Sequence, residues 1–300
     1  MSPSPLSIRK LGTIDCDIVE ANPVVWNGRL LRFEYIRWKS PEKHYHGNTL
    51  NRSYFRFIDC ADGSASAPFG IGLHMGNAFV WRDRMIVTAV EDWGKNRFYQ
   101  LESTDLEHWS APRVILENPE WQGYNTSVCR ADGRFVMVFE LGAPQEIVGI
   151  PFTMFFAESR DLRSWRVIPG ARFGFDRYTG GPMVHFFAGW FYLAYLDGSY
   201  ETGFRTRIVR SRDLTHWEES YASPVLDYDE CDRHLAADLA PGLRERIARA
   251  ENINASDLDM CEFGGKLHIV YSWGNQRGQE FLALGEVDAT EQDFCESYFD

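Results

Sequence analysis

Short apolar stretches recur in pairs along the chain, and each pair is joined by a few polar residues that usually include glycine. The stretches are rich in β-branched and aromatic residues, and the joining residues are often Asn-Gly, Asp-Gly or Gly-Gly, the chemistry of β-hairpin turns. The chain contains five such pairs, which predict hairpins that start near residues 22, 77, 125, 181 and 257. A further strand is predicted after three of them, within residues 98–101, 153–157 and 206–209.

A seven-residue motif, S-x-D-L-x-x-W, ends this further strand in three of the units. Its copies lie at 103–109, 159–165 and 211–217, so their tryptophans are 56 and 52 residues apart. Asp can accept backbone hydrogen bonds in a turn, Leu can anchor the turn, and Trp can fill the space between neighbouring units. We therefore interpret the motif as structural. Five repeats of three to four strands predict an all-β fold, a five-bladed β-propeller in which residues 1–300 form one domain.

The two ends of the chain differ from the central repeats. The first and last units carry degenerate copies of the motif, as expected where a ring is closed, and residues 6–16 are predicted to add a strand to the last blade. One helix is predicted from Asp238 to Glu251, with Asp238 as its cap and with apolar residues every four positions. This helix would be an insertion between blades four and five.

The composition excludes several classes of function. Aromatic residues make up 15% of the chain and the formal net charge is -12, which disfavours binding to the phosphate backbone of nucleic acids. No stretch is apolar enough for a signal peptide or a membrane span, so we expect a cytoplasmic protein with no membrane partner. The cysteines show no C-x-x-C spacing, and the acidic segment 227–232 lacks the Gly and terminal Glu of an EF-hand loop. We predict no metal site and no cofactor, and the oligomeric state stays open.

The five hairpins with D-L-x-x-W turns resemble the five-bladed propeller glycosidases over residues 6–299. This group comprises glycoside hydrolase family 43 and its relatives, such as families 32, 117 and 130. The resemblance implies an enzyme that acts on a terminal sugar of an oligo- or polysaccharide in a funnel on the propeller axis. For family 43 it implies a base Asp in the first blade, a pKa-setting Asp in the third and an acid Glu before Gly-Pro in the fourth. The corresponding positions here hold Asn22, Asn125 and Gly180.

Because the three expected carboxylates are replaced, we expect an atypical acid and base set. An amide cannot take a proton from water, so acids must come from other positions if the chain hydrolyses glycosides. The second strand of each hairpin returns to the funnel, and Glu140 ends such a strand after an apolar run. A carboxylate at the end of a buried strand requires either a polar partner or a functional role. The candidate catalytic residues are Glu20, Asp92, Glu140 and Asp257.

Amides form a second group of candidates, because they both donate to and accept from sugar hydroxyls. Three Asn residues stand at the start of the first three hairpins, and Asp257 is aligned with them in the fifth; capping of the strands is the alternative interpretation. His74 is a further candidate for the general acid, a role that the resemblance to family 117 implies, or a structural histidine. The candidate substrate-binding residues are Asn22, His74, Asn77, Asn125, Arg177 and Trp273.

Three functions remain open from the sequence. The first is a glycoside hydrolase, which requires at least two funnel carboxylates that face each other. The second is a non-catalytic glycan-binding propeller, which the replaced acids favour. The third is a phosphorylase of the mannoside phosphorylase type, which needs a basic phosphate pocket with Arg177 and His74. A basic cluster of Arg37, Lys39, Lys43, His44 and His46 is interpreted as a solvated face.

Overall fold

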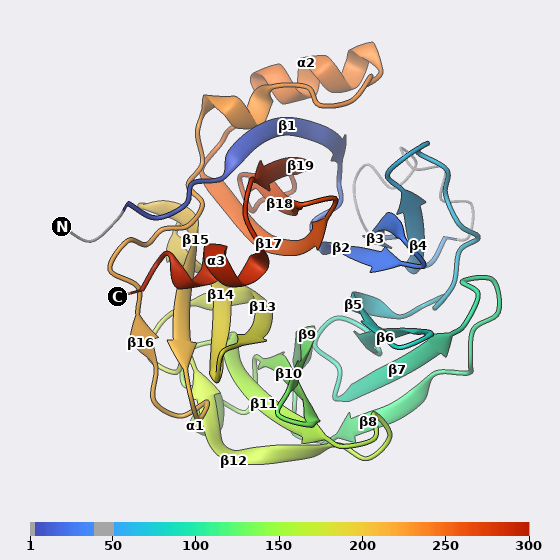
Figure 1. The fold of residues 1–300 in the computed structure, drawn as a ribbon, viewed down its shortest axis with the longest axis vertical. Coiled ribbons are helices and arrows are strands. Elements are labelled where there is room, and N and C mark those ends of the chain that lie inside the picture. Colours follow the sequence, from blue (N-terminus) through green and yellow to red (C-terminus); the bar gives the residue numbers. More distant parts are fainter. Residues whose placement is uncertain (1–3, 39–50, 300) are drawn as a thin grey trace.

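The computed structural model describes residues 4–38 and 51–299, and most of its regular structure is β-strand. The strands form antiparallel sheets that radiate from a common centre (Figure 1). In chain order the strands are β1 (Arg9–Cys16), β2 (Ala21–Trp26), β3 (Arg29–Ile36), β4 (Tyr54–Asp59), β5 (His74–Trp81), β6 (Arg84–Val90), β7 (Arg97–Ser103), β8 (Arg113–Glu117), β9 (Gly123–Ala131), β10 (Arg134–Leu141), β11 (Thr153–Ser159), β12 (Arg166–Phe173), β13 (Thr179–Phe187), β14 (Trp190–Ser199), β15 (Gly203–Ser211), β16 (Glu218–Glu219), β17 (Asn254–Phe263), β18 (Lys266–Gly274) and β19 (Glu280–Val287).

Sequential antiparallel pairing divides these strands into groups. Group one is β2–β4, group two is β5–β8 and group three is β9–β12, each a separate sheet. The largest sheet contains group four (β13–β16) and group five (β17–β19), which are linked by one parallel pair between Phe204 and Asn254. β1 pairs antiparallel with β19, so the N-terminal segment adds a strand to group five, as predicted.

The first strand of each group faces the centre of the ring (Figure 1). β2 contacts β5, β5 contacts β9, β9 contacts β13, β13 contacts β17, and β17 contacts β2, so these strands enclose an axis. Because neighbouring side chains on a strand point to opposite faces, every second residue of a first strand packs against an adjacent group. Residues near the ends of these strands can therefore converge on the axis.

The S-x-D-L-x-x-W motif joins neighbouring groups, which confirms its structural interpretation. In the first copy, Asp105 Oδ1 accepts two backbone N–H groups of the turn at 2.8 and 2.9 Å. Trp109 stacks on Phe69, which follows group one, with ring centroids 3.8 Å apart. Trp217 of the third copy packs against Phe173 of group three, with ring centroids 5.4 Å apart.

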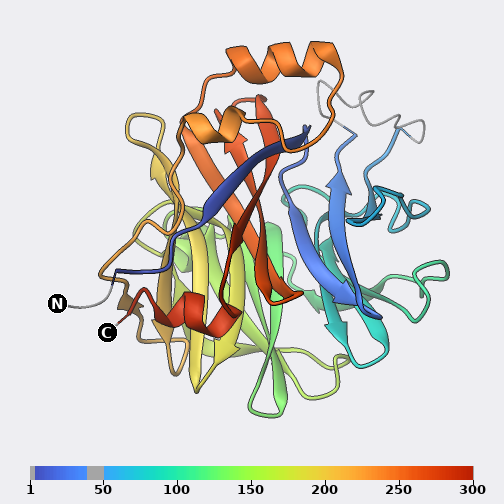
Figure 2. The same cartoon turned by 45° about the horizontal axis from the view of Figure 1, so that its top comes forward.

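The predicted helix is present in shorter form. The helices are α1 (Gln145–Val148), η1 (Glu230–Arg233), α2 (Pro241–Arg249) and α3 (Glu291–Glu296). α2 follows β16 in the chain and lies outside the ring, above one end of the strands (Figure 2). Its N-cap is Ala240, so the prediction that Asp238 caps the helix is wrong; Asp238 instead pairs with Arg244. Among the described residues, no helix is long and apolar enough to cross a bilayer.

Candidate active site

A small cavity of about 30 Å³ lies on the axis of the ring. This volume has room for about one or two water molecules. The polar lining consists of Glu20, which immediately precedes β2, and of Asn77, Asn125, Thr126, Asp257 and Asp259 on the first strands of groups two, three and five. Gly76 and Gly181 bring backbone close to the same space. The cavity is therefore a polar pocket at the point where the first strands converge.

β-Bulges set the directions of the side chains around this cavity. Register shifts interrupt the pairing of β5, β13 and β17 near the axis. Within them, Met75, Gly181 and Asp257 have φ angles of 47°, 54° and 51°. A bulge bends its strand and re-aims a side chain, and bulges are common beside active sites. Asp is among the few non-glycine residues that adopt this left-handed conformation readily, so Asp257 fits the bulge of β17.

The strand register defines two levels of residues around the axis. In each hairpin, the count starts at the residue of the first strand that forms the last pair before the turn. Six residues before it lie Glu20, Met75, Asn125, Gly181 and Asp257. Four residues before that pair lie Asn22, Asn77, Ser127, Met183 and Asp259. The predicted alignment of Asp257 with Asn22 and Asn77 is therefore wrong by two residues, because the strand from Asp257 to its hairpin turn is two residues longer than the strands from Asn22 and Asn77.

Glu20, Glu140 and Asp257 bring three buried carboxyl groups to this region. Burial raises the pKa of Glu140 to about 8, and the nearby charge of Asp257 raises it further. Burial also raises the pKa of Glu20 to about 7, against the lowering effect of Arg37. Burial raises the pKa of Asp257 only to about 6, since a hydrogen bond from Ser256 Oγ opposes the shift. At pH 7 Asp257 is therefore mainly ionised while Glu140 is mainly protonated.

Glu140 does not line the small cavity itself, but it contacts Asn125, which does. Its Oε2 accepts a hydrogen bond from Asn125 Nδ2 at 3.3 Å. Neither Glu140 Oε1 nor Glu20 Oε2 has a hydrogen-bond partner among residues 4–38 and 51–299. An unpaired buried oxygen is unfavourable, and a donor on a bound molecule would remove the penalty. Each of the two glutamates thus has one buried oxygen that can form a hydrogen bond with a bound ligand.

Gly181 is required for the position of Asp257. A Cβ atom on Gly181 would lie 2.6 Å from Asp257 Oδ1, and the φ of 54° disfavours other residues. We expect Gly181→Ala to lower kcat by about 10²-fold through displacement of Asp257. The free energy of unfolding should fall by about 1–3 kcal/mol because of the backbone strain.

Gly180→Ala is the matched control for this prediction. A Cβ atom on Gly180 would have ordinary contacts, 3.7 Å from Leu196 Cδ2 and 3.8 Å from Glu140 Oε1, and no left-handed backbone is involved. Glycoside turnover and urea denaturation should be measured for both variants. Equal turnover by the two variants would show that the close approach of residue 181 to Asp257 has no bearing on activity.

A larger cavity of about 470 Å³ lies beside the carboxyl cluster and is lined by Tyr35, Arg37, His74 and Asp92, among others. His74 Nδ1 is 2.6 Å from the Tyr35 hydroxyl oxygen, and His74 Nε2 is 3.2 Å from Asp92 Oδ1. Arg37 connects the two cavities, because its charge acts on Glu20. This volume is that of a small-molecule site. Asp92 therefore lies in the larger cavity with His74, and it does not line the small cavity.

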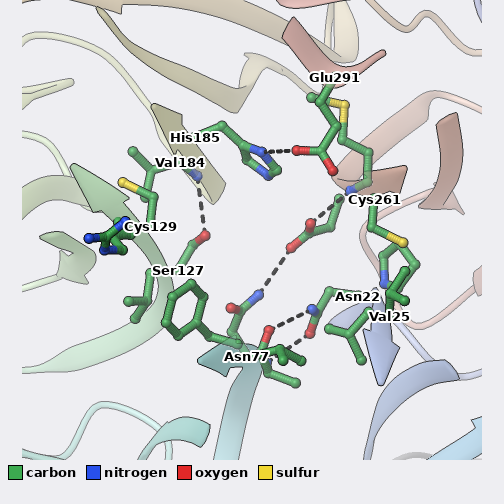
Figure 3. A pocket seen from close by; sticks show the side chains of 18 of the residues that line it. Asn22, Val25, Asn77, Ser127, Cys129, Val184, His185, Cys261 and Glu291 are labelled. Atoms are coloured by element: carbon green, nitrogen blue, oxygen red, sulfur yellow. Dashed lines mark hydrogen bonds and ion pairs between the residues drawn. The ribbon is translucent and has the colours of Figure 1, made fainter. Parts of the chain in front are cut away.

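A third cavity of about 380 Å³ opens at the opposite end of the axis (Figure 3). Asn77 Nδ2 donates to Asp259 Oδ2 at 3.0 Å, and both residues line this cavity and the small one. His185 Nδ1 is 2.8 Å from Glu291 Oε2, at the start of α3. Asp259 of β17 and Glu291 of α3 are thus each held by a side chain from a first strand of the ring.

Asn77 and Asn125 both line the small cavity and Asn22 does not, so the three candidate amides do not all converge on one space. Asn22 is structural: its side chain donates to Ala78 O and accepts from Ala78 N, both at 2.9 Å, which ties β2 to β5. Asn125 contacts Glu140, whereas Asn77 contacts Asp259 at the next level. Asn77 and Asn125 therefore approach the small cavity from different levels of the ring.

Two predicted substrate-binding residues are engaged elsewhere. Arg177 Nη2 donates to Glu219 Oε1 of β16 at 2.9 Å, and its guanidinium lies over the ring of Phe173. Trp273 is fully buried and its Nε1 donates to Thr13 Oγ1 at 2.7 Å. The prediction that Trp273 binds a substrate is wrong, because its side chain points from β18 into the packing against β1. Arg177 is likewise directed to the outer strand of group four.

The acidic segment 227–232 forms ion pairs with a lysine of β1. Lys10 Nζ lies 2.7 Å from Asp232 Oδ1 and 3.3 Å from Asp229 Oδ2. Asp232 is completely buried and also accepts a hydrogen bond from the Tyr271 hydroxyl at 2.8 Å. The lysine ammonium thus supplies the positive charge at this position. Within the described ranges, no group of three or more His, Cys, Asp or Glu is arranged to hold a metal ion.

Sequence reasoning missed the roles of Arg37 and Gly181. Arg37 was placed in a solvated basic cluster, but it pairs with Glu280 and lies close to Glu20. The other members of that cluster, between residues 39 and 50, lie outside the described residues. The available signal for Gly181 was a Gly-Gly-Pro sequence inside a strand, which indicates a bulge or a close backbone approach.

The fold has counterparts among solved glycoside hydrolases. An α-L-arabinofuranosidase from Podospora anserina, in complex with cellotriose, is 10% identical to this chain; the match covers 96% of this chain and 98% of that one, with a TM-score of 0.64. The catalytic domain of a GH62 α-L-arabinofuranosidase from Coprinopsis cinerea is 12% identical, with coverage of 95% and 98% and a TM-score of 0.64.

A third counterpart is longer than this chain. A xylan β-1,4-xylosidase from Bacillus halodurans is 14% identical over 97% of this chain and 55% of its own length, with a TM-score of 0.59. No family model and no curated protein matches the sequence. The chain therefore has the β-rich propeller fold of these glycoside hydrolases, and at this level of identity the similarity shows the fold alone.

Proposed function

We propose that this protein is a glycoside hydrolase that releases a terminal sugar from an oligo- or polysaccharide with an atypical acid and base set. The observation that carries the proposal is the cluster of three buried carboxyl groups at the axis, whose pKa values differ by environment. In this proposal the five strand groups are the blades of a five-bladed propeller. Residues 1–300 form one domain, with α2 inserted between blades four and five.

The roles follow from the ionisation of the cluster. Asp257 has the lowest of the three raised pKa values, about 6, so it is the general base that takes a proton from water. Glu140 has the highest, about 8, so it is the general acid that protonates the leaving oxygen. Glu20 lies beside Arg37 and positions the substrate. Such a pair of carboxyl groups is what glycoside hydrolysis requires.

The substrate class is narrowed by the size of the site and by its structural counterparts. The larger cavity, of about 470 Å³, is bordered by Trp93 and by several polar groups, a composition suited to a sugar. Two of the similar structures are described as α-L-arabinofuranosidases and one as a xylosidase. We therefore propose pentose-containing oligosaccharides, such as fragments of arabinoxylan, as the first substrates to test.

One alternative retains specific support. The amides and the glycine at the three positions where family 43 has acids favour a glycan-binding propeller without turnover. The phosphorylase alternative loses its support, because Arg177 pairs with Glu219 and His74 pairs with Asp92. These contacts leave neither side chain directed at a phosphate, and the hydrolase is the function that the carboxyl cluster supports best.

The pH dependence tests the proposed roles. We expect kcat/KM for arabinoxylan oligosaccharides to follow a bell with limbs near pH 6 and pH 8, measured as reducing sugar released across pH 4–10. Below pH 6 Asp257 is protonated and the base is lost. Above pH 8 Glu140 ionises and the acid is lost.

The same profile can be measured on variants. Asp257→Asn should remove the limb near pH 6 from any residual activity, and Glu140→Gln should remove the limb near pH 8. Limbs near pH 4 alone would mean that carboxyl groups with ordinary pKa values do the chemistry. That result would contradict the assignment of these roles to Asp257 and Glu140.

A further inference from the structure

A continuous arc of aromatic side chains borders the region of Glu140. Each ring centroid in the arc lies between 4.6 and 6.0 Å from the next. In order, the rings are Trp93, Tyr124, Phe152, Tyr178, Phe204 and Tyr200. This set is named the aromatic arc below. Tyr124 and Phe204 are buried in the core, and only the two end rings are exposed, as aromatic rings at ligand-binding surfaces are.

The arc is centred on group three, which carries Glu140. Trp93 follows β6 of group two, and Tyr200 lies between β14 and β15 of group four. Tyr124 immediately precedes Asn125, the residue that hydrogen-bonds to Glu140. The Tyr124 ring also approaches Gly142, where a Cβ atom would lie 2.8 Å from its Cε2. The Tyr124 ring of the arc therefore packs against the chain two residues after Glu140.

Electrostatics agree with this position. After burial, the charges of Glu140 and Asp257 are the largest causes that raise the pKa of the Tyr178 hydroxyl. The charge of Glu140 also adds to the burial that raises the pKa of Tyr124. Both tyrosines at the middle of the arc thus lie within the field of the carboxyl cluster. A molecule that binds at an exposed end of the arc and extends along it would approach Glu140.

The two ends of the arc are its accessible parts. Trp93 is 53% exposed and Tyr200 is 49% exposed, whereas Tyr124 and Phe204 are buried. The Tyr200 hydroxyl donates to Gln276 O at 3.1 Å, and the guanidinium of Arg277 lies 4.0 Å from the centre of its ring. Exposed rings that neighbours hold in place offer flat apolar faces at little entropic cost. The C–H faces of sugar rings fit such platforms.

We propose that the aromatic arc binds the leaving-group part of the substrate as a chain of at least two sugar units, with Trp93 and Tyr200 as stacking platforms. This inference rests on the proposed function, because the general acid defines the leaving-group side. Glu140 donates its proton to the leaving oxygen, so the sugar that carries this oxygen lies against the arc. The protein is therefore specific for oligosaccharides and polysaccharides rather than for small glycosides.

The test compares substrates that use the arc with one that does not. KM and kcat are measured for Trp93→Ala and Tyr200→Ala with arabinoxylan oligosaccharides and with xylosyl and arabinofuranosyl fluorides. A fluoride leaving group contacts no sugar subsite. Each variant should raise KM for the oligosaccharides about 5- to 10-fold, the loss of one aromatic contact. kcat/KM of Tyr200→Ala for the fluorides should stay within about 2-fold of the wild-type value, because Tyr200 does not line the larger cavity.

Tyr221→Ala is the matched control, because Tyr221 is 47% exposed but lies outside the arc. It should leave both KM values unchanged. Wild-type KM values for the oligosaccharides in both arc variants would overturn this inference and leave the proposed function intact. If the wild-type protein hydrolyses neither the oligosaccharides nor the fluorides, the proposed function fails and the leaving-group assignment fails with it.

Discussion

Glu140→Gln should lower kcat for arabinoxylan oligosaccharides by about 10³-fold, the effect of removing a general acid. Glutamine keeps the size and the hydrogen bond to Asn125 but cannot donate a proton to the leaving oxygen. Xylosyl and arabinofuranosyl fluorides should be hydrolysed at close to the wild-type rate, because fluoride leaves without protonation. Steady-state kinetics on both substrate types measure the difference.

Asp257→Asn is the matched variant for this experiment. Loss of the base should slow both types of substrate alike, and added azide should restore the rate by replacing the activated water. If Glu140→Gln slows the fluorides as much as the oligosaccharides, Glu140 is not the acid. Glu20→Gln would then be the next variant to test, because Glu20 has the second highest pKa in the cluster.

The Glu140→Gln variant should fold, which keeps the test interpretable. Burial raises the pKa of Glu140 from 4.5 to about 8, so between these values the folded protein binds more protons than the unfolded chain. The contribution of Glu140 to the free energy of unfolding therefore falls as the pH rises from 4.5 to 8. Glutamine does not ionise, so the variant should be at least as stable as the wild type at pH 8 in urea denaturation.

Lys10→Met should lower the free energy of unfolding by about 3–5 kcal/mol, the loss expected when a buried ion pair keeps only one partner. Lys10 Nζ is 2.7 Å from Asp232, which is completely buried. The pair joins β1 to η1, so it fixes the strand that completes group five. Urea denaturation gives the change directly.

Lys266→Met is the control for a lysine that is partly exposed. Lys266 Nζ is 3.0 Å from Glu286, but 43% of its side chain is exposed, so its removal should change stability by less than about 1 kcal/mol. The double variant Lys10→Met/Asp232→Asn should recover part of the loss, because no unpaired charge remains buried. A loss in Lys10→Met no larger than that in Lys266→Met would mean that the N-terminal strand is held by its backbone pairing alone.

The repeats could be predicted from the sequence because they are local patterns. The S-x-D-L-x-x-W motif contains both its turn chemistry and the Trp that packs on the preceding group, and the hairpins have clear turn residues. α3 was not predicted, because its six residues are too few for a helical period to be recognised. The motif therefore predicts the repeated strand groups, whereas a short connecting helix such as α3 has no recognisable sequence pattern.

The site was only partly predictable, for reasons of register and direction. Glu20, Glu140 and Asp257 were identified from their places at strand ends, and the structure brings these three together. Asp92 lies instead in the neighbouring cavity, and Trp273 points to the other face of its strand. A shift of one residue reverses the face of a side chain. Bulges add such shifts where first strands approach the axis, so sequence spacing cannot place individual side chains there.

The most direct test is an NMR time course of the wild-type protein with arabinoxylan oligosaccharides at pH 7. One sample reports both binding, through saturation transfer to the sugar protons, and turnover, through new anomeric signals of a released pentose. The carboxyl cluster predicts saturation transfer followed by release of the terminal sugar, and no release by Glu140→Gln. Saturation transfer without any new anomeric signal from the wild-type protein would identify a glycan-binding propeller and contradict the proposed hydrolase.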